Sequence, residues 1–114
     1  MDVRLVQLLG SFIRARGDYA LARLEFAMHD GEATAPPVID RLTDASELTL
    51  RVEWPVVERQ LDAALAFGKT LAAQYRSPDR QPGYRALERS LRELDQYARA
   101  IRWVLTVTET EDRK

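Results

Sequence analysis

The C-terminal half of the chain carries a regular seam of apolar residues that recur at alternating steps of three and four. The seam consists of Tyr84, Leu87, Leu91, Leu94, Ala98, Ile101 and Leu105. This is the a/d spacing of helices that pack against a neighbour along their whole length. It predicts a helix over residues 81–106. A frayed tail is expected at 109–114, because helix-poor and charged residues take over there.

The preceding segment carries a matching seam. It consists of Val57, Leu61, Ala64, Gly68, Leu71 and Tyr75. Pro55 suits the first turn of a helix, where its missing N–H costs nothing, so a helix is predicted over 55–76. Residues 77–82 are rich in turn formers and form a short connection. The two helices are therefore predicted to be antiparallel neighbours in a hairpin.

Gly68 lies in this seam between Ala64 and Ala72, and such small residues let two helix backbones come close. We expect Gly68 to make room for a bulky side chain of the opposite helix, Trp103 or Tyr97. The alternative is a groove that receives a partner helix or an apolar ligand.

The N-terminal segment is also amphipathic. At 100° per residue its apolar side chains span an arc of roughly 160°. They include Leu5, Leu9, Phe12 and Ile13. An arc this wide indicates packing against two neighbours or against a second subunit, and we therefore predict a homodimer through these residues.

Two parts of the N-terminal half are harder to interpret. Gly17 with Asp18 predicts a break, followed by a second helix over 19–28, although a single helix through Gly17 is the alternative. Residues 35–42 are expected to form a turn or a short helix. Residues 48–54 alternate like a strand, but the capping spacing of Asp44 and Glu47 favours a helical or irregular connection. The fold prediction is one all-α domain over 1–114, a helical bundle built on the hairpin with one or two N-terminal helices.

Composition narrows the chemistry. The 114 residues include no cysteine and one histidine, and 17 basic side chains oppose 18 acidic ones. Thiolate metal sites, iron–sulfur clusters and a cysteine nucleophile are excluded. No apolar run approaches the ~18 residues of a membrane span, and the start of the chain does not look like a signal peptide. We expect a cytoplasmic protein without a membrane partner.

Candidate catalytic groups are sparse. Glu25 and His29 share a helix face, but two such residues near a helix end do not make a metal site, and His29 is expected to favour the helix dipole. A phosphotransfer role for His29 is disfavoured because acidic residues follow it. No serine has a nucleophile-elbow setting. We predict no enzyme, no cofactor and no metal.

The most distinctive polar feature is a stripe of arginines beside the last seam. It consists of Arg85, Arg89, Arg92, Arg99 and Arg102. Such a stripe could contact a protein partner or bind nucleic-acid phosphates. Carboxylates four residues away offer pairing for Arg92, Arg89 and Arg99, which blunts the positive field. We therefore predict a non-catalytic protein–protein interaction module: an adaptor, an inhibitor or a small assembly subunit. A nucleic-acid-associated subunit is the alternative.

Overall fold

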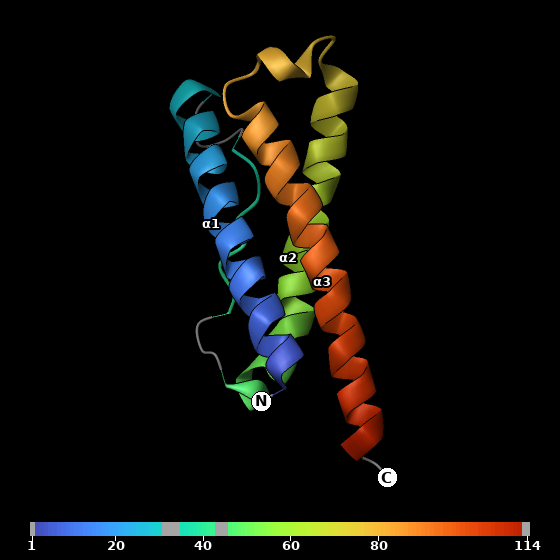
Figure 1. Ribbon diagram of the computed structural model, residues 1–114. Coiled ribbons are helices and arrows are strands. Elements are labelled where there is room, and N and C mark those ends of the chain that lie inside the picture. Colours follow the sequence, from blue (N-terminus) through green and yellow to red (C-terminus); the bar gives the residue numbers. More distant parts are fainter. Residues whose placement is uncertain (1, 31–34, 43–45, 113–114) are drawn as a thin grey trace.

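The computed structural model describes residues 2–30, 35–42 and 46–112, and it contains no strand within those ranges. Three long helices, α1 (Val3–Asp30), α2 (Glu47–Gln74) and α3 (Tyr84–Asp112), form an elongated bundle of 53 × 23 × 20 Å (Figure 1). A short 3-10 helix, η2 (Pro78–Arg80), lies in the connection between α2 and α3. The predicted all-α helical bundle is confirmed.

The helices do not alternate simply up and down. In Figure 1, α1 and α2 run in the same direction, and α3 returns antiparallel to both. The predicted hairpin is therefore present as α2 and α3. The most extensive packing of α3, however, is against α1 rather than against its hairpin partner.

The seam predicted for α3 faces the core. From Leu87 to Leu105 each of its six members is buried, and Tyr84 packs against the core at the edge. On α2 the seam from Val57 to Leu71 is buried apart from Gly68, which is half-buried, and Tyr75 is 40% exposed. Burial of these leucines and alanines away from water is what holds the bundle together.

The helix α2 begins eight residues before the predicted start at 55, so the strand alternative for 48–54 is wrong. The side chain of Ser46 accepts a hydrogen bond from the backbone N–H of Thr49 at 3.2 Å and caps the helix. Leu50 and Trp54 extend the seam upstream by steps of four and three, and both are fully buried. Pro55 lies inside the helix, where this packing outweighs the hydrogen bond that proline cannot make.

The N-terminal segment is one helix, so the predicted break at Gly17 is wrong and the single-helix alternative is confirmed. Asp2 caps α1, because its carboxylate accepts the backbone N–H of Arg4 at 2.8 Å. Hydrogen bonds from Arg4 lower the pKa of the Asp2 carboxyl to about 2. The helix ends at Asp30, where the sequence predicted an end; Gly31 lies outside the described residues.

Residues 35–42 form an extended strap rather than the predicted turn or short helix. Every third side chain of the strap is buried: Pro36, Ile39 and Leu42. Two consecutive prolines favour an extended chain with three residues per turn. Side chains of α1 secure it: the Tyr19 hydroxyl donates to the Pro37 carbonyl at 2.5 Å, and the Arg23 guanidinium donates to the Pro36 carbonyl at 2.7 Å.

The helix α3 continues beyond the predicted end at 106. Thr106, Thr108 and Thr110 each donate a hydroxyl hydrogen bond to the carbonyl four residues earlier, so these side chains are satisfied within the helix. Residues 109–112, expected in a frayed tail, form its last turn, and residues 113–114 lie outside the described range. Before α3, Gly83 adopts a φ of 80° and approaches the Ala22 carbonyl so closely that a Cβ would lie 3.1 Å from its oxygen.

Candidate interaction surfaces

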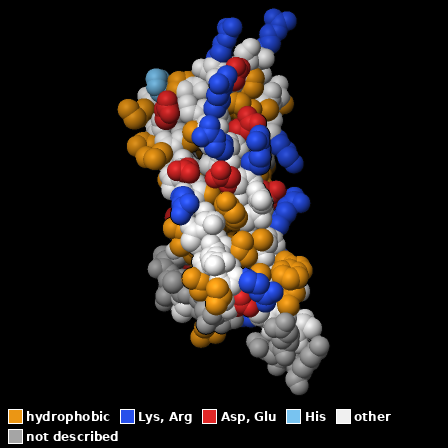
Figure 2. Space-filling model, in the orientation of Figure 1, with side chains coloured by type: hydrophobic (Ala, Val, Ile, Leu, Met, Phe, Trp, Pro, Cys, Tyr) orange, Lys and Arg blue, Asp and Glu red, His pale blue; other side chains and the backbone are white. Residues whose placement is uncertain are grey.

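The predicted arginine stripe lies on α3, and most of it is already paired with carboxylates. Arg92 and Arg99 form ion pairs with the acids one turn earlier, Glu88 at 2.9 Å and Asp95 at 3.3 Å, as predicted. The Arg85 guanidinium lies 3.7 Å from the Asp79 carboxylate in η2. Figure 2 shows that basic side chains concentrate over η2 and the start of α3, with acidic side chains among them. These pairs compensate part of the local positive field.

Arg89 differs from its neighbours. The spacing of four residues predicts an ion pair between Arg89 and Glu93, but Arg89 makes no ion pair with a described residue. It is exposed on α3. Within the stripe this leaves one arginine without an ion pair to a described residue, and affinity for nucleic acid grows with the number of neutralised phosphates.

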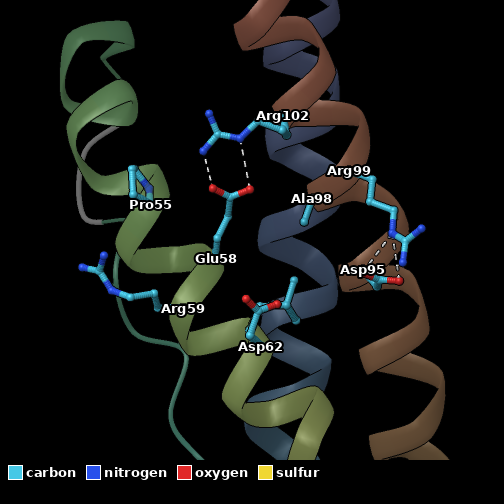
Figure 3. A pocket seen from close by; sticks show the side chains of 9 residues that line it. Pro55, Glu58, Arg59, Asp62, Asp95, Ala98, Arg99 and Arg102 are labelled. Carbon is cyan, nitrogen blue, oxygen red and sulfur yellow. Dashed lines mark hydrogen bonds and ion pairs between the residues drawn. The ribbon is translucent and has the colours of Figure 1, made fainter.

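Among the described residues, Arg102 makes the ion pair of the stripe that links α3 to α2. Its guanidinium forms a two-pronged contact with the Glu58 carboxylate of α2, with Nε at 3.1 Å from one oxygen and the terminal nitrogen on the other (Figure 3). The hydrogen bond to Glu58 raises the pKa of Arg102 above its usual value. Glu58 and Arg102 are 44 positions apart in the sequence, so a spacing rule within one helix does not predict this pair.

A groove of about 480 Å³ lies between α2 and α3 around this pair. Arg102 with Glu58 and Arg99 with Asp95 line it, and Arg59 extends away from α3 (Figure 3). Two guanidinium–carboxylate pairs line the groove together with the Asp62 carboxylate, and its lining contains no hydroxyl, thiol or imidazole.

Farther along the same helices, a more apolar hollow of about 290 Å³ lies beside Gly68. A Cβ on Gly68 would lie 3.1 Å from the Cδ1 atom of Leu91. The residue that Gly68 accommodates is thus Leu91, and the expectation of Trp103 or Tyr97 is wrong. Trp103 is 58% exposed instead, with the Arg4 guanidinium 5.7 Å from its ring centroid.

His29 lies exposed in the last turn of α1. Within the described residues, no three histidine, cysteine or acidic side chains come together as candidate metal ligands. None of the described helices is both long and apolar enough to cross a membrane.

The residues predicted for partner packing divide into two groups. Leu5, Leu9 and Phe12 are at most 5% exposed and belong to the chain's own core, where Phe12 packs edge-to-face on Trp54 at a centroid distance of 5.3 Å. A second copy cannot reach these three while the bundle is folded. Ile13 is 43% exposed and faces outward. The wide apolar arc therefore contains two stripes, of which one packs into the core of the chain and the other is exposed on its surface.

The outward stripe runs along the whole of α1, and the width of the apolar arc alone does not separate it from the buried stripe. We call it the outer α1 face. It consists of Val3, Val6, Gly10, Ile13, Gly17, Ala20, Leu21, Leu24, Ala27 and Met28. At 100° per residue these positions fall in an arc of about 120°, and no charged residue of α1 lies in that arc.

Exposure of the large side chains on the outer α1 face is high. Leu24 is 55% exposed, Leu21 68% and Met28 77%. Figure 2 shows hydrophobic side chains beside the single histidine, at the margin where α1 ends. A strip about 38 Å long and about 10 Å wide has an area on the order of 400 Å², the size of the largest apolar patch on a typical monomer, and such patches are often functional.

Two glycines in the middle of this face are unexplained by the fold of a single chain. A Cβ built on Gly10 or on Gly17 meets nothing within 4 Å. Each glycine costs roughly 1 kcal/mol of helix propensity relative to alanine. No contact with the described part of the chain requires either glycine to be small.

In comparisons with known proteins, no family model, curated protein or solved structure matches the chain.

Proposed function

We propose that this protein is a non-catalytic protein–protein interaction module that docks a helical partner on the outer α1 face. The observation that supports this proposal most strongly is the uncharged apolar stripe exposed along the 28-residue helix α1. Large apolar side chains such as Leu24 and Met28 are stabilised when they leave water, and a partner protein supplies that environment. The module acts as an adaptor, an inhibitor or a small assembly subunit in the cytoplasm.

The arginine stripe plays a smaller part in this proposal. Arg85, Arg92, Arg99 and Arg102 already pair with carboxylates of the same chain. A partner that used these arginines would first have to break the existing pairs. A nucleic-acid partner is consequently not favoured over a protein partner.

The proposal is tested by photo-crosslinking in the native cell. A photo-reactive amino acid is placed at Leu24 on the outer α1 face, and the matched control carries it at Leu48, which is 77% exposed on α2. We expect the Leu24 probe to form an adduct with one defined polypeptide, identified by mass spectrometry, and the Leu48 probe not to form it. Adducts from neither position, or the same adducts from both, would contradict the proposal.

A further inference from the structure

We propose that the partner of the outer α1 face is a second copy of this chain, docked with its α1 antiparallel about a two-fold axis near residue 15. This inference rests on the proposed function and names the occupant of that surface. An isologous contact requires that one patch be complementary to itself. The order of small and large residues along the outer α1 face has this property.

The spacing of the seam positions on this face is symmetric about residue 15. These positions are Val3, Val6, Gly10, Ile13, Gly17, Ala20, Leu24 and Ala27. When the helices are antiparallel, position i of one copy lies level with position 30 − i of the other, so that a and d positions meet. The layers that result are Val3 with Ala27, Val6 with Leu24, Gly10 with Ala20, and Ile13 with Gly17. Each layer occurs twice. At the centre, the exposed Ile13 of each copy lies over the bare backbone of Gly17 of the other.

The sizes of these residues match the geometry of two crossing helices. Crossing helices come closest at the crossing point and diverge toward their ends. Three of the four central seam residues, Gly10, Gly17 and Ala20, are small, and the fourth, Ile13, lies opposite Gly17; large side chains such as Val6 and Leu24 are nearer the ends. This arrangement explains why the glycines have open space in the single chain: the space is filled by the second copy.

The parallel arrangement fits less well. It would place Gly10 against Gly10 and Gly17 against Gly17, while Ile13 would meet another Ile13. Two layers would then be empty and the layer between them would hold the backbones apart. Antiparallel packing also opposes the two helix dipoles.

Charges beside the seam are mixed in the antiparallel register, because Arg14 comes within two residue levels of both Asp18 and Arg14 of the other copy, and Arg16 on the opposite flank comes equally near the other Arg16. Arg14 and Asp18 are both exposed on the same flank of the face. In this register Arg14 of one copy and Asp18 of the other differ in level by two residues, about 3 Å along the axis. The two-fold axis repeats this pair. The interface is small, roughly 400 Å² per copy, so the dimer is expected to be weak and reversible.

Disulfide trapping tests both the occupant and its orientation, and it has no background because the chain has no cysteine. Two purified full-length variants, Val6→Cys and Leu24→Cys, are mixed at tens of micromolar and oxidised. Both positions are exposed, so neither substitution disturbs the core. Val52→Cys, at an exposed position of α2, controls for random collision.

We expect the disulfide between Val6→Cys of one copy and Leu24→Cys of the other to form at least about tenfold faster than any disulfide with Val52→Cys. The reason is that the first two cysteines occupy one layer in this register. Disulfides of each variant with itself would overturn the antiparallel arrangement. No trapping above the Val52→Cys control would overturn the second copy as partner. If a crosslinked adduct of a different polypeptide still formed at Leu24 in cells, the proposed function would survive that failure.

Discussion

Replacing Gly17 with alanine separates the folding of one chain from its association. Gly17 lies in the middle of α1, and a Cβ added there meets no atom within 4 Å. The substitution therefore adds helix propensity without a clash inside the chain, and we expect the free energy of unfolding of the monomer to rise by about 1 kcal/mol. For a chain of this size that corresponds to an increase in Tm of about 4 °C.

The same methyl group has the opposite effect on the dimer. It fills the space into which Ile13 of the second copy packs, so it moves the two backbones apart at their closest approach. We expect the dissociation constant of the dimer to rise while the monomer becomes more stable. Gly10→Ala is seven residues away and should act independently, so the double variant should gain about 2 kcal/mol in the monomer.

Two measurements follow these effects. Urea unfolding monitored by circular dichroism at low protein concentration gives the monomer stability, and sedimentation velocity at high concentration gives the association. A Gly17→Ala monomer less stable than the wild type would show that the face is covered within one chain. Unchanged or tighter association would show that no second backbone approaches Gly17.

Three further predictions concern the bundle itself. Phe12→Ala should lower the free energy of unfolding by about 3–5 kcal/mol, because Phe12 is fully buried against Trp54. Ile13→Ala should lower the free energy of unfolding of the monomer by less than ~1.5 kcal/mol, because Ile13 is partly exposed. Urea unfolding distinguishes the two variants, and equal losses would contradict the two-stripe description of α1. Burial raises the pKa of Tyr19, so its phenol should stay protonated well above pH 10 while an unfolded tyrosine ionises. Its contribution to stability should be complete below pH 10 and fall as the pH rises further. Tyr19→Phe should reduce this loss and the late part of the absorbance titration at 295 nm, and an unchanged pH profile would contradict the burial of the Tyr19 phenol. The Glu58–Arg102 pair is partly exposed, so a double-mutant cycle should give a coupling of only about 0.5–1 kcal/mol that shrinks with salt; a coupling unaffected by salt would contradict this estimate.

Much of the fold was predictable because the seams of α2 and α3 are strictly periodic. The seven positions from Tyr84 to Leu105 needed no tertiary information to be assigned to one face. The start of α2 was missed because Pro55 suits a helix start so well. The upstream signal was nevertheless present, since Leu50 and Trp54 continue the seam of Val57 with the same spacing.

The interaction surface was less predictable, and the reason lies in α1. This helix carries apolar residues on two faces, so periodicity alone cannot decide whether Phe12 or Ile13 faces the core. The expected break at Gly17 also divided the outer stripe into two short pieces. Only the packing of α1 against α3 and the strap shows which stripe remains in water. The Glu58–Arg102 pair was equally hidden, because it joins residues far apart in the chain.

Sedimentation velocity over a range of concentrations tests most directly whether the outer α1 face associates with a second copy. The wild type and Leu48→Arg, which changes an exposed leucine of α2, should shift from monomer to dimer as concentration rises into the tens of micromolar. Leu24→Arg should stay monomeric, because it places a charge in a layer that occurs twice in the dimer. A wild-type protein that remains monomeric throughout, or a Leu24→Arg variant that dimerises as well as Leu48→Arg, would contradict association through this face.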